Sequence, residues 1–153
     1  MRNDLKLAAF CVQRRSVAAA IFIGTHLGFC DARQLPSNRQ KAESGAMGFV
    51  HWIIESFDID FAALEVLNGK DDLMRTGIYH ATENSLRTRS VSIETIETEK
   101  LLSAFSVPAK AFRKDVREVI TTIWPILASA KTHPAKLDAA ALGLYCQTDR
   151  LLH

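Results

Sequence analysis

LKLAAFCVQRRSVAAAIFIGTHLGFCDARQL, residues 5–35, is the stretch of this sequence that decides the fold. Two apolar runs, residues 5–12 and 17–23, are short and rich in small, β-branched and aromatic side chains, which is typical of strands. A third such run follows at residues 27–35. The breaks between the runs are short enough for tight turns, so we expect three strands in an antiparallel meander.

Two further segments extend this sheet into an α/β domain. Residues 39–57 carry apolar side chains at helical spacing after a capping Ser37 or Asn38, which predicts an amphipathic helix. Residues 61–67, FAALEVL, are almost continuously apolar and contain one charge, Glu65. Such a run is typical of a strand buried on both faces in a parallel sheet.

The remaining segments are predicted to alternate between helix and strand. We expect helices at residues 71–88, 98–105, 108–123 and 137–152, and a fifth strand at residues 91–96. Neither an internal repeat nor a linker divides the chain. The sequence therefore predicts a single α/β domain over residues 1–153: a five-stranded mixed sheet, made of the meander and two parallel strands, flanked by helices.

Composition constrains the function only loosely. The 153 residues are 48% hydrophobic and 24% charged, and their formal net charge of +2 neither indicates nor excludes a nucleic-acid partner. Three cysteines without a CxxC pair suggest buried thiols in a reducing compartment. The longest apolar tract, residues 17–24, is far short of a membrane span, and we expect a cytoplasmic protein. Sequence motifs of P-loop, dinucleotide-binding, nucleophile-elbow and HExxH sites are absent.

The order of elements resembles the ribonuclease H-like superfamily, and its details are most similar to the RuvC-type Holliday junction resolvases. Residues 11–22 are similar to the first hairpin of that family, and residues 61–67 to its fourth strand, which presents a catalytic Glu. Residues 136–144, KLDAAALGL, resemble the motif of its last helix.

This resemblance implies a site for two Mg²⁺ or Mn²⁺ ions, held by carboxylates from the first strand, the fourth strand and the last helix. Such ions prefer oxygen ligands and can stabilise both the attacking and the leaving oxygen in phosphodiester hydrolysis. Glu65 and Asp138 stand at two of the family's acidic positions, and are the candidate catalytic and metal-binding residues. Cys11 and Ala141 stand where the family has its other two acids, which puts two-metal catalysis in doubt.

Each candidate carboxylate has a second interpretation. A lone Glu65 in an apolar strand is costly unless it faces a cleft, reaches solvent at the strand end, or pairs with a Lys or Arg. Asp138 could also serve only as an acid in the first turn of a helix, stabilised by the helix dipole.

Basic residues gather in two places. Arg14 and Arg15 lie at the expected hairpin tip, and Lys110, Arg113, Lys114 and Arg117 recur at helical spacing. In the family such elements face the phosphate backbone, so Arg14, Arg15, Lys110, Arg113 and Lys114 are the candidate nucleic-acid-binding residues. The helical stripe could equally be a solvated face, because Asp115 and Glu118 offset its charge.

Three functions remain open at this point. The first is a RuvC-like protein that cleaves or binds branched DNA in a metal-dependent way, as a homodimer if it follows the family. The second is a catalytically inactive relative that serves as a binding or assembly module, which the missing acids support. An enzyme of another class on the same scaffold is the third, and no motif supports it.

Overall fold

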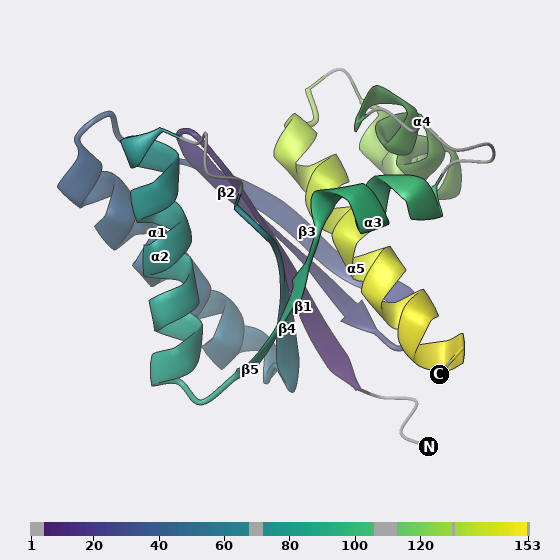
Figure 1. The fold of residues 1–153 in the computed structure, drawn as a ribbon, viewed down its shortest axis with the longest axis horizontal. Helices are drawn as coiled ribbons and strands as arrows, with labels where there is room; N and C mark the ends of the chain where they lie inside the picture. Colours follow the sequence, from purple (N-terminus) through teal and green to yellow (C-terminus); the bar gives the residue numbers. More distant parts are fainter. Residues whose placement is uncertain (1–4, 68–71, 106–112, 130, 153) are drawn as a thin grey trace.

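The computed structural model describes residues 5–67, 72–105, 113–129 and 131–152 and has three layers, with one sheet between two groups of helices (Figure 1). The chain opens with an antiparallel meander of β1 (Lys6–Gln13), β2 (Ser16–Ile23) and β3 (His26–Gln34). A two-residue turn, Arg14 and Arg15, joins β1 to β2, with Gln13 opposite Ser16. The meander predicted from residues 5–35 is confirmed.

Two parallel strands complete the sheet. β4 (Phe61–Glu65) lies beside β1, and β5 (Ser92–Ile96) lies beside β4, which gives the strand order β3-β2-β1-β4-β5. Every residue of β4 before Glu65 is buried, as expected for a central parallel strand. The five-stranded mixed sheet is therefore as the sequence predicts.

One face of the sheet is covered by α1 (Arg39–Phe57) and α2 (Leu73–Thr88), which pack against each other (Figure 1). The side chain of Asn38 caps α1 by accepting a hydrogen bond from the backbone N–H of Lys41, and Asp72 caps α2 in the same way through Arg75. Both helices thus start at a capping side chain that accepts an N–H of their first turn.

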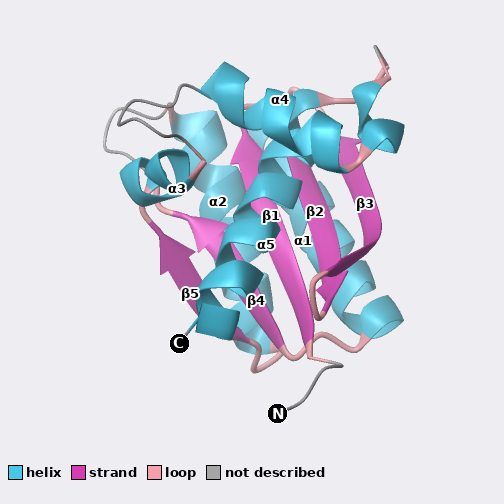
Figure 2. Ribbon diagram, turned by 90° about the vertical axis from the view of Figure 1, so that its right-hand side faces the viewer, coloured by secondary structure: helices cyan, strands magenta, loops and turns pink. Residues whose placement is uncertain are grey.

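The other face carries α3 (Thr98–Ala104), α4 (Arg113–Ile123), a 3₁₀ turn (Pro125–Ala128) and α5 (Pro134–Leu152) (Figure 2). Helix α5 lies across β1 and β2, and α4 packs on α5. Gly143 brings α5 close to the sheet, since a Cβ there would collide with the ring of Phe22. A larger residue at this position would force the helix away from β2.

Alternation along the strands creates a hydrophobic core on each face. Leu7, Ala9 and Cys11 of β1 face α5, whereas Ala8 and Phe10 face α1 and α2. The many alanines of β1, β2 and β4 have small side chains that project little from the sheet, so the helices approach it closely.

Most element boundaries agree with the prediction to within one residue, and the larger differences include those at α5 and β4. α5 begins at Pro134 rather than at residue 137, because a proline fits the first helical turn and the Nδ1 atom of His133 accepts the N–H of Ala135. β4 ends at Glu65 rather than at residue 67, and the 3₁₀ turn was not predicted. The predicted start of a helix at residue 108 lies outside the described residues.

The three cysteines are not bonded to one another. Cys11 and Cys146 are buried, Cys30 is half-buried, and all three are free thiols. Burial raises the pKa of both Cys30 and Cys146 to about 12, so these thiols stay protonated. Among the helices that the structure describes, none has the length and hydrophobicity needed to cross a membrane.

Candidate functional site

A cleft of about 240 Å³ lies where β1 and β4 end, beside the tip of the β1–β2 hairpin. Its walls come from β1, β4, α2, α4 and α5, so five elements distant in sequence meet there. The polar side chains in its lining are, in chain order, Gln13, Arg14, Glu65, Arg75, Tyr79, Arg113, Arg117 and Asp138. Parallel strands present their carboxyl ends at one edge, which is the usual place for a ligand in such sheets.

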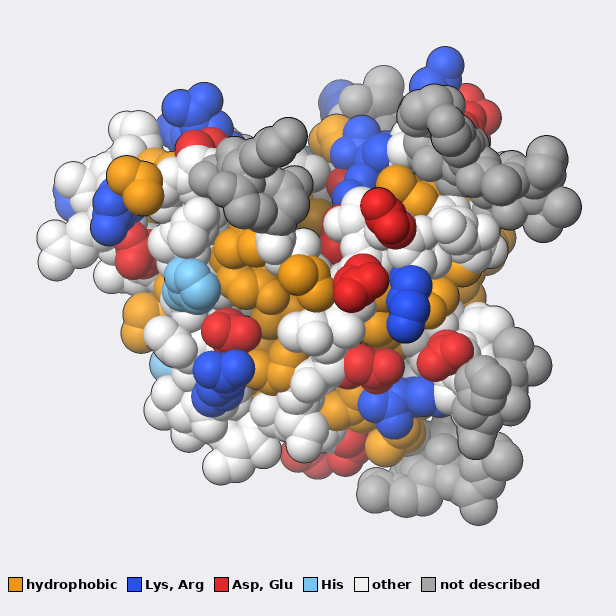
Figure 3. All heavy atoms as spheres, in the orientation of Figure 1, with side chains coloured by type: hydrophobic (Ala, Val, Ile, Leu, Met, Phe, Trp, Pro, Cys, Tyr) orange, Lys and Arg blue, Asp and Glu red, His pale blue; other side chains and the backbone are white. Residues whose placement is uncertain are grey.

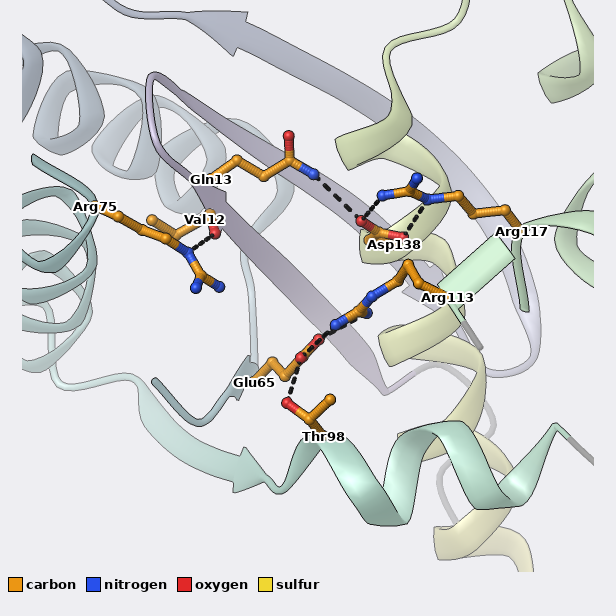
Figure 4. Close-up of polar contacts among 8 residues, drawn as sticks. All are labelled: Val12, Gln13, Glu65, Arg75, Thr98, Arg113, Arg117 and Asp138. Carbon is orange, nitrogen blue, oxygen red and sulfur yellow. Dashed lines mark hydrogen bonds and ion pairs between the residues drawn. The ribbon is translucent and has the colours of Figure 1, made fainter. Parts of the chain in front are cut away.

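Glu65 ends β4 and is clamped by Arg113 of α4 (Figure 4). The two Nη atoms of Arg113 donate to the two carboxylate oxygens at 3.0 and 2.6 Å, and the hydroxyl of Thr98 donates to Oε2 at 2.6 Å. Burial alone would raise the pKa of Glu65, but the hydrogen bonds and charge of Arg113, followed by the hydrogen bond of Thr98, outweigh it and hold that pKa below its usual value. Glu65 is therefore a carboxylate whose charge is already matched.

Asp138 of α5 is held in the same manner by Arg117 (Figure 4). Arg117 donates from Nε at 2.9 Å and from Nη2 at 2.8 Å, and the Gln13 side chain adds a third hydrogen bond at 3.2 Å. The Asp138 side chain is only 3% exposed. A bidentate contact of this kind is the strongest form of guanidinium–carboxylate pairing, and it raises the pKa of Arg117.

Both arginines come from one face of α4. Arg113 and Arg117 are four positions apart, which places them one turn from each other, and Val116 and Ile120 anchor the helix in the core. The stripe of basic residues predicted on this helix thus divides: Arg113 and Arg117 turn inward to the carboxylates, whereas Lys114 is exposed.

Cys11 and Ala141 contribute no acid to this cleft. Burial, then the charges of Asp138 and Glu65, raise the pKa of the Cys11 thiol, so it stays protonated. Ala141 is fully buried and has no ligand atom. Within the described part of the chain, no three His, Cys, Asp or Glu side chains are grouped so that they could hold a metal ion.

These donors do not fit the Mg²⁺ or Mn²⁺ pair that the resemblance implies. A hard cation needs several oxygen ligands, and a protonated thiol is a poor substitute. Both remaining carboxylates already accept two hydrogen bonds from an arginine. Two guanidinium groups therefore neutralise the acids that would otherwise bind the ions.

Two more arginines border the cleft. Nε of Arg75, in the first turn of α2, donates to the carbonyl oxygen of Val12 at 2.8 Å (Figure 4). Arg14, at the hairpin tip, lies 3.6 Å from Asp72, and its side chain is 77% exposed. In a space-filling view, several Lys and Arg side chains lie along the upper margin, the side on which β1 ends, and others are scattered over the rest of this face (Figure 3).

The structure brings most of the candidate residues to one place. Glu65, Asp138 and Arg113 meet in the cleft, and Arg14 lines it. Arg15 and Lys114 are exposed, and Lys110 lies outside the described residues. For Glu65, the geometry matches the interpretation in which it pairs with an arginine. Asp138 is not in the first turn of α5, because the helix starts at Pro134. The interpretation of Asp138 as an acid of the first helical turn, stabilised by the helix dipole, is therefore wrong.

Two residues of the cleft could not be singled out from the sequence. Arg75 is 63 positions away from its Val12 partner and contacts a backbone carbonyl, which leaves no signal in the residue pattern. Gln13 is an ordinary polar residue before a turn. Arg117 had a signal, its spacing from Arg113, but that spacing did not show which side of α4 faces the core.

Comparison with known structures identifies the architecture. Over 96% of its length, the chain superposes on 96% of Thermus thermophilus RuvC in complex with a Holliday junction substrate, with a TM-score of 0.77 at 11% sequence identity. The chain has the RuvC fold. It is also similar to the fowlpox virus resolvase bound to Holliday junction DNA (TM-score 0.65, 13% identity, 96% of this chain and 99% of that one).

A third RuvC-like structure is the yeast mitochondrial Holliday junction resolvase, with a TM-score of 0.67 at 7% identity over 98% of this chain and 83% of that one. No family model and no curated protein sequence matches the chain. At 7–13% identity these RuvC-like neighbours establish the fold, and function must be argued from the cleft itself.

Proposed function

We propose that this RuvC-like chain binds branched DNA and does not cut it. One observation carries the proposal: each of the two acids at the end of the sheet is neutralised by its own arginine through two hydrogen bonds. An ion entering the cleft would have to displace both guanidinium groups. It would gain two carboxylates in return, because Cys11 and Ala141 offer no further oxygen.

The nucleic-acid part of the proposal is supported by exposed positive charge on the hairpin tip and on α4. Arg14, which lines the cleft, and Arg15 lie exposed at the hairpin tip, and Lys114 is exposed on α4, next in sequence to the clamped Arg113. Exposed cations of this kind bind phosphates and release counterions. Two of the structures with the same fold contain Holliday junction DNA, which favours a branched duplex as the ligand.

A homodimer, which the resemblance implies, is part of this proposal. Light scattering on the purified chain, alone and with a four-way junction, tests it: we expect twice the chain mass for the free protein, and twice the chain mass plus the mass of one junction for the complex. A monomer in both would remove the dimer from the proposal and leave the DNA contacts of the single chain in place.

The decisive experiment measures binding and cleavage on the same four-way DNA junction, with a matched duplex as control. We expect salt-sensitive binding that prefers the junction, no gain in affinity when Mg²⁺ or Mn²⁺ is added at matched ionic strength, and no cut product. Affinity for the junction no better than the ~10⁻⁴–10⁻⁶ M of non-specific contacts would contradict DNA binding. Metal-dependent cutting that disappears in Glu65→Gln would contradict the inactive state.

A further inference from the structure

The cleft that lacks a metal-ligand set has a second property, an excess of positive charge. Among the residues that the structure describes, four arginines and two carboxylates line it, and the difference between these numbers gives a formal charge of +2. Glu65 and Asp138 pair with Arg113 and Arg117, and the other two arginines of the lining are Arg14 and Arg75. Asp72 offsets part of the Arg14 charge, but that pair is 3.6 Å long and exposed, which makes it weak.

We infer that this cleft is a metal-free binding site for a phosphate group, formed by Arg75, Arg113 and Arg117 and bordered by Arg14. The inference rests on the proposed function in one respect, because DNA would supply the phosphate as part of its backbone. The guanidinium groups would then meet the anion directly, where a RuvC-type resolvase would use ions.

The carboxylates prepare the arginines for this role. Each guanidinium has five N–H donors in a planar fork, and the contacts of Arg113 with Glu65 and of Arg117 with Asp138 use two donors apiece. Because the carboxylates already hold both guanidinium groups in position, phosphate binding would cost little conformational entropy of the two arginine side chains. Glu65 and Asp138 are positioning residues in this arrangement.

Arg75 is fixed by a different element. Its Nε–H bond to the carbonyl of Val12 holds the guanidinium at the end of β1, and its positive charge reaches both Glu65 and Cys11, lowering the pKa of each side chain against the effect of burial. Arg75 therefore acts on the same space as the two clamped arginines, from the opposite layer of helices. Three guanidinium groups thus approach the end of the sheet from α2 and α4 (Figure 4).

The size of the cleft suits a small anion. Its volume of about 240 Å³ is below the ~300–1,000 Å³ typical of pockets that enclose a drug-sized ligand. A phosphate group of a backbone fits such a space, whereas the attached sugar and base would stay outside. Binding here would therefore depend little on base sequence.

The first test uses inorganic phosphate, and so does not depend on DNA binding. Phosphate is titrated against chloride at matched ionic strength, and the side-chain Nε–H resonances of the arginines are followed by NMR. We expect saturable shifts at Arg75, Arg113 and Arg117 within tens of millimolar phosphate, and none at Arg87, which lies at the other end of α2. Uniform small shifts at all exposed arginines, or none, would overturn the inference.

The second test compares two arginines on one helix. Arg75→Gln and Arg87→Gln each remove one positive charge from α2, but Arg87 is exposed and pairs with Glu83 away from the cleft. We expect the slope of log K against log[salt] for junction DNA to fall by about 1 in Arg75→Gln. The Arg87→Gln slope should equal that of the wild type.

A conservative variant covers the possibility that Arg75→Gln disturbs the fold. Arg75→Lys keeps the charge and loses the fork, so we expect it to keep the wild-type salt slope while phosphate binds several-fold more weakly. Equal slopes in Arg75→Gln, Arg87→Gln and the wild type, with DNA still bound, would reject the phosphate site and leave the proposed function standing. Saturable shifts with phosphate in a protein that binds no DNA would support the phosphate site and reject the proposed function.

Discussion

Glu65 shows how the place of a residue can be predicted from the sequence while its chemistry stays open between two interpretations. Its position in an apolar run indicates a charge near a strand end, and the structure places it at the end of β4 facing a cleft. Its partner, Arg113, is 48 positions further along the chain. Sequence spacing cannot show whether such a carboxylate accepts from a guanidinium or is left open for a cation.

The Glu65–Arg113 pair can be measured by a double-mutant cycle of Glu65→Gln and Arg113→Gln. Removing Arg113 leaves a nearly buried carboxylate without its main partner, and we expect a loss of about 3 kcal/mol in the free energy of unfolding. The coupling between the two substitutions should be about 2 kcal/mol near neutral pH. Urea unfolding of the four proteins gives these values.

The same coupling should depend on pH with a definite sign. The pKa of Glu65 is lowered in the folded protein, so the native state holds the proton less tightly than the unfolded chain does. The contribution of the pair is therefore complete above the unfolded value of about 4.3 and is lost as the pH falls through the lower folded value. A coupling that stays constant from neutral pH down to strongly acidic solution would contradict the assignment of this charge pair.

At the level of elements, the sequence predicts the strands better than it predicts the contacts between helices and sheet. Short apolar runs with tight turns are local features, and all five strands appear where expected, within two residues. Contacts of α4 and α5 with the sheet join residues far apart in the chain. Gln13 and Asp138, which meet in the cleft, are 125 positions apart.

Gly143 gives a prediction about the contact of α5 with the sheet. In Gly143→Ala the new methyl group would collide with the ring of Phe22, so α5 must shift or the ring must rotate. We expect a loss of about 1–3 kcal/mol, measured as a lower thermal midpoint. Gly48→Ala is the matched control, because position 48 lies in the exposed face of α1 with no atom within 4 Å of a new Cβ.

The two substitutions should change the stability of the protein in opposite directions. Replacing an exposed helical glycine by alanine raises the free energy of unfolding by about 0.5–1 kcal/mol, because the unfolded chain has less conformational entropy. If Gly143→Ala stabilised the protein as much as Gly48→Ala does, the close approach of α5 to β2 would be refuted, and with it the placement of Asp138 over the end of β1.

For the whole molecule, the acids and arginines of the cleft decide whether folding is linked to a divalent ion or to an anion. A ligand that binds only the folded state stabilises it, and at ten times its dissociation constant the gain is about 1.4 kcal/mol. In a chain of this size such a gain would raise the thermal midpoint by about 3–5 °C.

We expect no such rise with Mg²⁺ or Mn²⁺ in the millimolar range, because Arg113 and Arg117 already hold the carboxylates. Differential scanning calorimetry in chloride salts, with Na⁺ at equal ionic strength as control, measures this. A metal-dependent rise that Asp138→Asn removes would show that the arginines yield to an ion, and the charge of the cleft would then have to be assigned again from the bound state.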